Sequence, residues 1–268
     1  MESFMGPRAG ACLKTVASPA RASRFKLARG ETRGVGIPVV AAPTYLYVRH
    51  RAPSEDPPFE LAFGKALDVA ISQFNYYSRR TWRPLIKQAQ RCAMAILRSE
   101  LRRLGVEASR EEVEEAARRL WRMLAAWSKS PYTRFLRPKT HALIFADRDG
   151  GFCGALYAQP DFADSLTDHF YEVKSFNVEE RPRKHVEVQS RVFSLLGPLH
   201  LVYFAEVSGF YELREKVVHA DLSVIDDVVA FLRENPPGAE VVALTYLLEC
   251  YPHRVYVREG GRWKRAKA

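Results

Sequence analysis

The spacing of apolar residues changes near residue 131, from the period of helices to the period of strands. Over residues 59–104 the apolar positions follow helical spacing with an interruption at Thr81-Trp82-Arg83-Pro84, so we predict two helices, the second ending at Gly105. Ser109 followed by Glu112 is typical of a capping box and predicts the start of a third helix. The chain before residue 131 therefore supplies a group of helices.

After Pro131 short apolar runs are bounded by turn residues, which is typical of strands. We predict four strands and one helix here, namely strands over 141–147, 152–162, 170–176 and 199–206 and a helix over 186–196. Beyond Gly209 the pattern indicates an extended segment, a helix over 223–233, a final apolar strand and a hairpin at Gly260-Gly261. This order of helices and strands predicts an α/β fold.

The predicted elements divide the chain into four parts. Residues 1–50 have little periodicity and are predicted to be a basic, mobile tail. Residues 59–108 are predicted to form a helical lobe, residues 109–206 an α/β core, and residues 207–268 an α/β extension packed on that core.

The charge of the chain indicates its class of partner. The formal net charge is +10, and residues 1–50 hold eight Lys or Arg against two Glu, about +6 of that total. A basic protein favours polyanionic partners because its phosphate contacts release condensed counterions, although a solvated surface is an equal alternative. No apolar run is long enough to span a membrane, so we expect a cytoplasmic protein. The chain has only three Asn and five Gln, a bias that fits a thermophile.

The four cysteines argue against a cysteine-ligated metal centre. Cys12, Cys92, Cys153 and Cys250 lie far apart, and the chain has no CxxC pair. Zinc ribbons and iron–sulfur clusters need closely spaced cysteines. We therefore predict no iron–sulfur cluster.

Two carboxylates and a lysine are expected to converge on the strands. Glu172 and Lys174 lie two apart on one predicted strand, so their side chains project from the same face. A hairpin centred between Leu166 and Thr167 would place Asp161 opposite Glu172, with Cβ atoms about 4.5–5.5 Å apart. Ordinary cross-strand ion pairing is the alternative. However, Glu172-Val173-Lys174 is the only E-x-K in the chain, and no D-x-K occurs.

Such a group is suited to metal chemistry. Two close carboxylates repel each other unless one is protonated or a cation lies between them. Mg²⁺ or Mn²⁺ prefers oxygen ligands and would resolve this repulsion. A bound metal can activate a water for attack on a phosphodiester, and Lys174 would lie beside that water.

The stretch Gly154–Phe193 resembles the RecB-like branch of the PD-(D/E)XK nucleases. The matching pieces are Gly154, Pro160-Asp161, Glu172-Val173-Lys174 and Gln189-Ser-Arg-Val-Phe193, the last with Phe where the family has Tyr. The resemblance implies a restriction-endonuclease-like core, with a central mixed β-sheet flanked by helices. It also implies that Gln189 points into the site to hold the lysine, the water or a phosphate, and that Phe193 serves packing only.

This branch also carries a metal ligand upstream, typically His in a G-x-x-x-H helix. Gly64-Lys65-Ala66-Leu67-Asp68 occupies a comparable place, so the resemblance makes Asp68 a candidate third ligand beside Asp161 and Glu172. Glu111, Glu114 and Glu115 are rivals, and an ordinary exposed helix residue is an equal alternative for Asp68.

Basic residues follow the predicted catalytic strand. Arg181, Arg183 and Lys184 precede a predicted helix, a position suited to a phosphate backbone, although a solvated loop is the alternative. The sequence thus predicts a metal-dependent nuclease acting on DNA, with a DNA-repair role and a helicase or other repair factor as a possible partner. Two alternatives stay open: a non-catalytic nucleic-acid-binding protein of the same fold, and an RNA- or junction-specific endonuclease using the same site.

Overall fold

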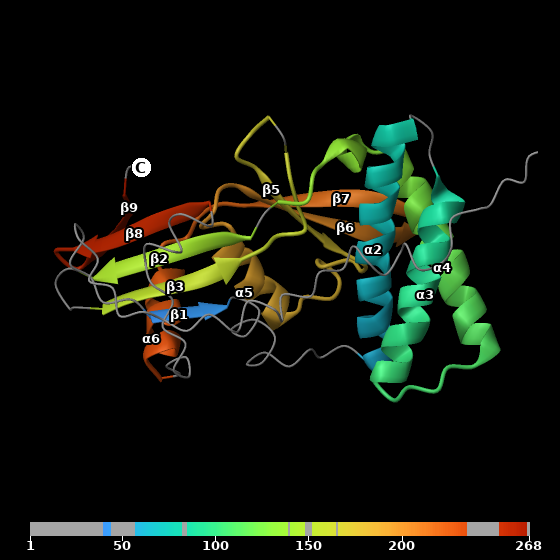
Figure 1. Cartoon of the computed structure of the whole chain (residues 1–268), viewed down its shortest axis with the longest axis horizontal. Helices are drawn as coiled ribbons and strands as arrows, with labels where there is room; N and C mark the ends of the chain where they lie inside the picture. Colours follow the sequence, from blue (N-terminus) through green and yellow to red (C-terminus); the bar gives the residue numbers. More distant parts are fainter. Residues whose placement is uncertain are drawn as a thin grey trace, which may run out of the picture.

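The computed structural model describes residues 40–43, 57–81, 85–138, 140–147, 152–164, 166–234 and 252–266. Three helices form one end of the molecule, a four-stranded sheet lies in the middle, and a five-stranded sheet forms the other end (Figure 1). Both sheets contain parallel and antiparallel strand pairs, and helices pack against them. The predicted α/β class is therefore confirmed.

The helical end consists of α2 (Pro58–Thr81), α3 (Ile86–Arg103) and α4 (Arg110–Ser128). The capping box that begins α4 is present, with the Ser109 hydroxyl accepting from the Glu112 amide and the Glu112 carboxylate accepting from the Ser109 amide. After α3 the chain turns at Gly105, whose φ of +68° suits glycine. Apolar side chains from α2, α3 and α4 form a core with one face of the four-stranded sheet.

The four-stranded sheet has the order β4-β5-β6-β7. Its strands are β4 (Phe162–Ala163), β5 (Phe170–Lys174), β6 (Leu199–Val207) and β7 (Phe210–Val218). Strands β5 and β6 are parallel, and α5 (Lys184–Phe193) connects them, as a crossover between parallel strands requires. Strands β6 and β7 form a hairpin whose turn, Ser208-Gly209, has positive φ at both residues.

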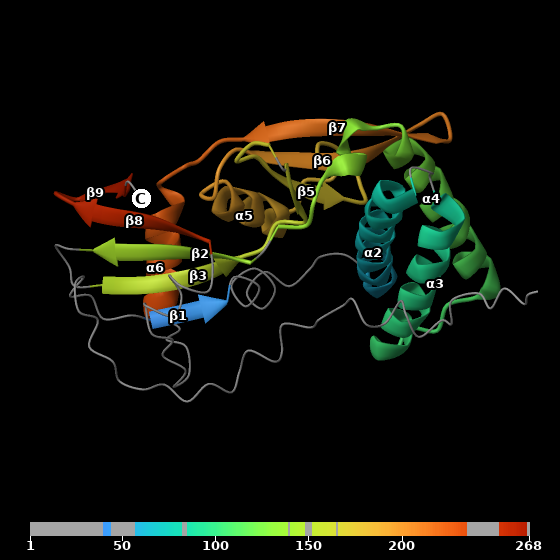
Figure 2. The ribbon, with the colours of Figure 1, turned by 45° about the horizontal axis from the view of Figure 1, so that its top comes forward.

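The five-stranded sheet has the order β1-β3-β2-β8-β9. Its strands are β1 (Val40–Pro43), β2 (His141–Asp147), β3 (Phe152–Ala158), β8 (His253–Glu259) and β9 (Arg262–Arg265). A 3-10 turn, η3 (Pro131–Arg134), precedes β2, and α6 (Val224–Glu234) packs with α5 against this sheet in a second core. Figure 2 shows this sheet and the helical bundle at opposite ends of the molecule.

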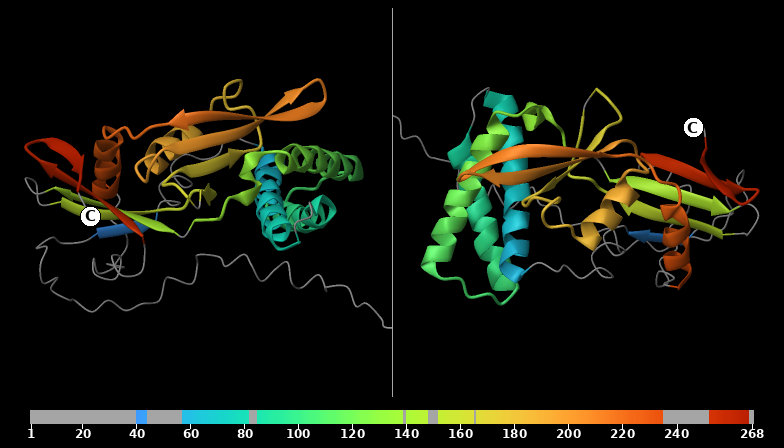
Figure 3. Two further views of the ribbon diagram at one scale, coloured as in Figure 1. Left: turned by 90° about the horizontal axis from the view of Figure 1, so that it is seen from above. Right: turned by 180° about the vertical axis from the view of Figure 1, so that it is seen from behind.

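The prediction of one central sheet is wrong, because the chain divides its strands between two sheets. The strand predicted over 152–162 is interrupted at Gln159-Pro160-Asp161, and β3 and β4 on either side belong to different sheets. Pro160 has no amide hydrogen to donate to a ladder, which favours a break at this point. Views from above and from behind show the chain passing from one sheet to the other (Figure 3).

The two ends of the sequence also contribute strands. Residues 40–43 lie in the predicted mobile tail, yet their short apolar run pairs in parallel with β3 as β1. The rest of that tail lies outside the described residues. Within residues 207–268, β7 extends the four-stranded sheet and β8 pairs in parallel with β2, and the hairpin predicted at Gly260-Gly261 joins β8 to β9.

Within the described ranges, no helix combines the length and the apolar character that crossing a bilayer needs.

Candidate active site

The β4–β5 hairpin brings Asp161 and Glu172 together. Phe162 pairs with Tyr171, so the next pair along the ladder is Asp161 and Glu172, as the predicted register requires. The Asp161 amide donates to Glu172 Oε2 at 3.3 Å, and the Val173 amide donates to Asp161 Oδ2 at 2.9 Å. Both carboxylates are thus fixed by the backbone of the hairpin.

Lys174 extends from the same face of β5 as Glu172 and joins the group to α5. Its Nζ donates to Glu172 Oε1 at 2.8 Å and to Gln189 Oε1 at 2.8 Å. The side chains of Lys174 and Glu172 are only 15% and 6% exposed, so this pair is shielded from water. Phe193, one turn beyond Gln189, is buried in the second core, which agrees with a packing role.

The positive charge of Lys174 does not offset the negative charge of the carboxylates around Asp161. Burial raises the pKa of Asp161 well above its usual range, and the nearby carboxylates of Glu172 and Asp68 raise it further. Lys174 and the Val173 amide act in the opposite direction without cancelling this rise. Asp161 therefore favours a bound proton or a bound cation over a bare negative charge.

Asp68 reaches this group from α2. Gly64 lies near Ser175, the residue that follows β5, since a Cβ placed on Gly64 would be 3.8 Å from Ser175 Oγ. Asp68, one turn further along the helix, is close enough to raise the pKa of Asp161 but forms its own ion pair with Arg137. The rival ligands Glu114 and Glu115 instead pair with arginines on α4, and neither is among the carboxylates that raise this pKa.

Arg137 is a member of the site that the sequence did not indicate. Its guanidinium contacts Asp68, and its Nε donates to Ser72 Oγ at 2.8 Å. Burial alone would lower the pKa of Arg137, but the carboxylates of Asp68, Asp161 and Glu172 raise it. Arg137 therefore supplies the second positive charge beside three carboxylates. The i, i+4 spacing of Asp68 and Ser72 places them on one helix face, yet nothing local marks Arg137 as their partner.

The donor chemistry of Asp161 and Glu172 fits a hard divalent cation. Mg²⁺ is commonly held by one or two carboxylates, with waters or phosphate oxygens completing its shell. Within the described ranges, however, no three His, Cys, Asp or Glu side chains are grouped closely enough to hold a metal. The Asp68 carboxylate is paired with Arg137 in this arrangement, so its role as a third ligand stays a prediction.

The predicted phosphate-binding residues lie on the connection from β5 to α5. Arg181 and Lys184 are exposed, and Arg183 is the N-cap residue of α5, with its guanidinium carbon 5.8 Å from the centre of the Phe176 ring. All three follow Lys174 within ten residues along the chain, and Lys184 begins α5, the helix whose Gln189 accepts a hydrogen bond from Lys174.

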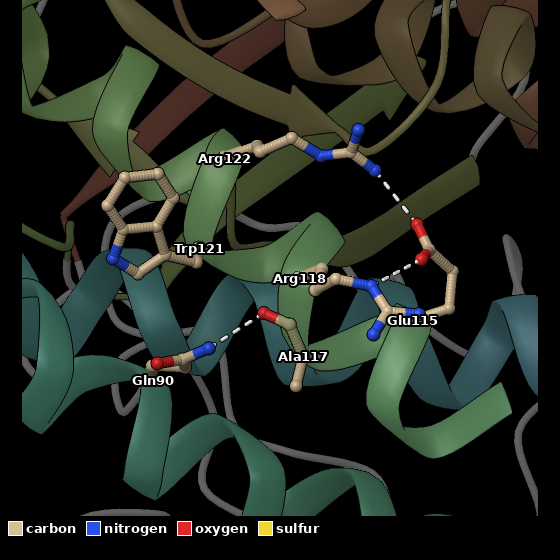
Figure 4. A pocket seen from close by; sticks show the side chains of 6 residues that line it. All are labelled: Gln90, Glu115, Ala117, Arg118, Trp121 and Arg122. Carbon is tan, nitrogen blue, oxygen red and sulfur yellow. Dashed lines mark hydrogen bonds and ion pairs between the residues drawn. The ribbon is translucent and has the colours of Figure 1, made fainter. Parts of the chain in front are cut away.

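A separate pocket of about 450 Å³ lies between α3 and α4. It is lined by Gln90, Glu115, Ala117, Arg118, Trp121 and Arg122 (Figure 4). None of these residues belongs to the candidate active site.

Comparison with protein-family models, with curated proteins and with solved structures gave no match. A functional conclusion therefore depends on the chemistry of the residues described above.

Proposed function

We propose that the chain is a divalent-metal-dependent nuclease that hydrolyses phosphodiester bonds in DNA. The observation that carries this proposal is the convergence of Asp161, Glu172, Lys174 and Gln189 from two hairpin strands and α5 onto one shielded point. An ordinary surface ion pair does not need these further contacts. Here Gln189 accepts from Lys174, the Val173 amide donates to Asp161, and Asp68 is a third carboxylate nearby. The same proposal includes a restriction-endonuclease-like core, here built around the four-stranded sheet whose strand β5 carries Glu172 and Lys174, because the strands are divided between two sheets.

Each residue has a distinct role in this proposal. Asp161 and Glu172 would hold Mg²⁺ or Mn²⁺ through their carboxylate oxygens. When bound, the metal would acidify a water and offset charge on the phosphoryl oxygens. Lys174, held by Glu172 and Gln189, orients the attacking water and offsets the negative charge that develops during attack. Arg181, Arg183 and Lys184 would contact the backbone of the substrate.

One observation favours the alternative of a non-catalytic nucleic-acid-binding protein. Lys174 and Arg137 already occupy oxygens of Glu172 and Asp68, so two carboxylates have internal cationic partners. A protein that had lost its metal could retain the fold with such pairs. The alternative of an RNA- or junction-specific endonuclease uses the same residues and differs only in substrate.

One assay separates these functions. Purified protein would be incubated with Mg²⁺ or Mn²⁺ and end-labelled single-stranded, double-stranded and branched DNA, and with RNA. Metal-dependent cleavage of DNA supports the proposal, and cleavage confined to RNA or to branched DNA favours the specialised endonuclease. Binding of nucleic acid without cleavage of any substrate favours the non-catalytic protein.

Removal of either candidate ligand is expected to weaken metal binding. Asp161→Asn and Glu172→Gln each replace an anionic oxygen by a neutral amide of similar size, so we expect Mn²⁺ affinity to fall at least about ten-fold in calorimetry. Asp164→Asn is the matched control, since Asp164 lies in the same hairpin but accepts its hydrogen bond from the Leu166 amide. Undiminished affinity in both site variants would favour the non-catalytic protein.

Removal of the Arg137 charge is expected to strengthen metal binding. Arg137→Gln frees the Asp68 carboxylate and leaves the group more negative, so Mn²⁺ affinity should rise. The pair is partly exposed, with the Arg137 side chain 45% accessible, and we expect a gain of up to about five-fold. Arg134→Gln, three residues earlier on η3, should leave the affinity unchanged. A loss of metal affinity in Arg137→Gln would show that Asp68 does not face the metal.

A further inference from the structure

Four basic side chains form a line along the outward face of α3. Lys87, Arg91, Arg98 and Arg102 are all exposed. With 3.6 residues per turn, their spacings of four, seven and four keep them within roughly 60° of one another around the helix. At about 1.5 Å of rise per residue the line is about 22 Å long. We call these four residues the cationic stripe.

Within the described part of the chain, no acidic side chain forms an ion pair with the cationic stripe. Glu100, the acidic residue of α3, is 8% exposed and pairs with Lys65 and Arg103 on another side of the helix. The ion pairs found in the described part of the chain do not include any stripe residue. The opposite face of α3 is buried against α2 and α4, so the stripe is presented to solvent.

The pocket between α3 and α4 borders this stripe. Gln90, one turn from Lys87, donates from its Nε2 to the Ala117 carbonyl at 2.7 Å and so joins the two walls of the pocket. Trp121 stands at the pocket with 48% of its surface exposed (Figure 4). Arg118 and Arg122 also line it, each paired with Glu115. An accessible indole thus lies in a pocket whose other wall, α3, carries the cationic stripe.

We propose that α3 and α4 form a binding surface for single-stranded DNA, in which the cationic stripe contacts phosphates and Trp121 stacks on a base. Cations arranged along a line match the repeated charge of a polynucleotide backbone, and every base offers a face to an exposed aromatic ring. In a duplex the faces of the bases are covered, so Trp121 would have no such contact. None of these residues belongs to the candidate active site, and the inference rests on the proposed nuclease function only for the choice of DNA.

The salt dependence of binding tests the stripe. Full-length protein would be titrated with labelled dT20 in EDTA at several salt concentrations, so that no cleavage interferes and a failure of the nuclease proposal does not affect the result. The triple variant Arg91→Gln, Arg98→Gln, Arg102→Gln should lower the slope of log affinity against log salt by about 2, or about 0.7 per lost phosphate contact. The control, Arg262→Gln, Lys264→Gln, Arg265→Gln, removes the same charge from exposed positions on β9 and should change the slope much less.

The indole is tested separately. Trp121→Ala should weaken dT20 binding at least about five-fold without changing the salt slope, because stacking carries no net charge, and Trp121→Phe should retain most of the affinity. An unchanged slope in the stripe variant would overturn the proposal. Equal losses on duplex DNA, with no effect of Trp121→Ala, would overturn the single-strand assignment, and tighter binding of rU20 than of dT20 would overturn the assignment to DNA.

Discussion

Replacing Lys174 with alanine is expected to lower the rate of phosphodiester cleavage by on the order of 10³-fold or more. The Lys174 ammonium is held by Glu172 and Gln189, and in the proposed reaction alanine would remove its charge from the point at which negative charge develops. The side chain ends in a polar group at the end of β5 rather than in either apolar core, so the fold should survive. The measurement is turnover on saturating DNA with Mn²⁺.

Two measurements distinguish loss of chemistry from loss of structure. Lys174→Ala should retain the circular dichroism spectrum of the folded protein and its DNA affinity in EDTA, although loss of the partner of the buried Glu172 lowers its stability. Lys216→Ala, which removes an exposed lysine from β7, should cleave at the parental rate. Cleavage by Lys174→Ala at the parental rate would show that the assigned site is wrong.

Replacing Trp127 with alanine is expected to reduce the free energy of unfolding by about 3–5 kcal/mol. Trp127 is fully buried on α4, and its Nε1 donates to Asn75 Oδ1 at 2.8 Å. Its ring lies 5.5 Å from that of Tyr132 and 6.0 Å from that of Phe162, measured between centroids, so it joins the helices to the strand beside Asp161. Truncation leaves a cavity and removes a hydrogen bond from the buried Asn75 amide.

Thermal unfolding followed by circular dichroism checks this expectation. At roughly 2–4 °C per kcal/mol for a chain of this size, the midpoint should fall by about 6–20 °C. Trp121→Ala is the matched control on the same helix, because its side chain is half exposed and its loss should change stability by about 0.5 kcal/mol or less. Equal midpoints for the two variants would contradict a core role for Trp127.

Features of the fold that depend on local signals could be predicted from the sequence. The capping box at Ser109, the helix end at Gly105 and the hairpin at Gly260-Gly261 each depend on residues within one turn of each other, and all three are present. The facing pair Asp161 and Glu172 was predictable for the same reason, because the centre of a hairpin fixes its register.

Features that depend on distant segments could not be predicted in this way. The parallel pairing of β2 with β8 joins strands more than one hundred residues apart, and the apolar pattern of a buried strand does not identify its neighbour. The division into two sheets follows from such pairings. Pro160 indicates only that the strand is interrupted locally, and not that its two halves join different sheets. Arg137 was missed because its partners Asp68 and Ser72 come from a helix far back in the chain.

The β2–β8 pairing has a consequence for the order in which the protein can form during synthesis. The four-stranded sheet and the residues of the candidate active site come from α2 through β7, but the five-stranded sheet needs β8, which begins at His253. Until the ribosome has passed that point, one edge of β2 has no partner, and an unpaired edge is a template for pairing with other chains. The nascent protein is therefore most prone to aggregate through its five-stranded sheet, at a stage when its candidate active site can already be assembled.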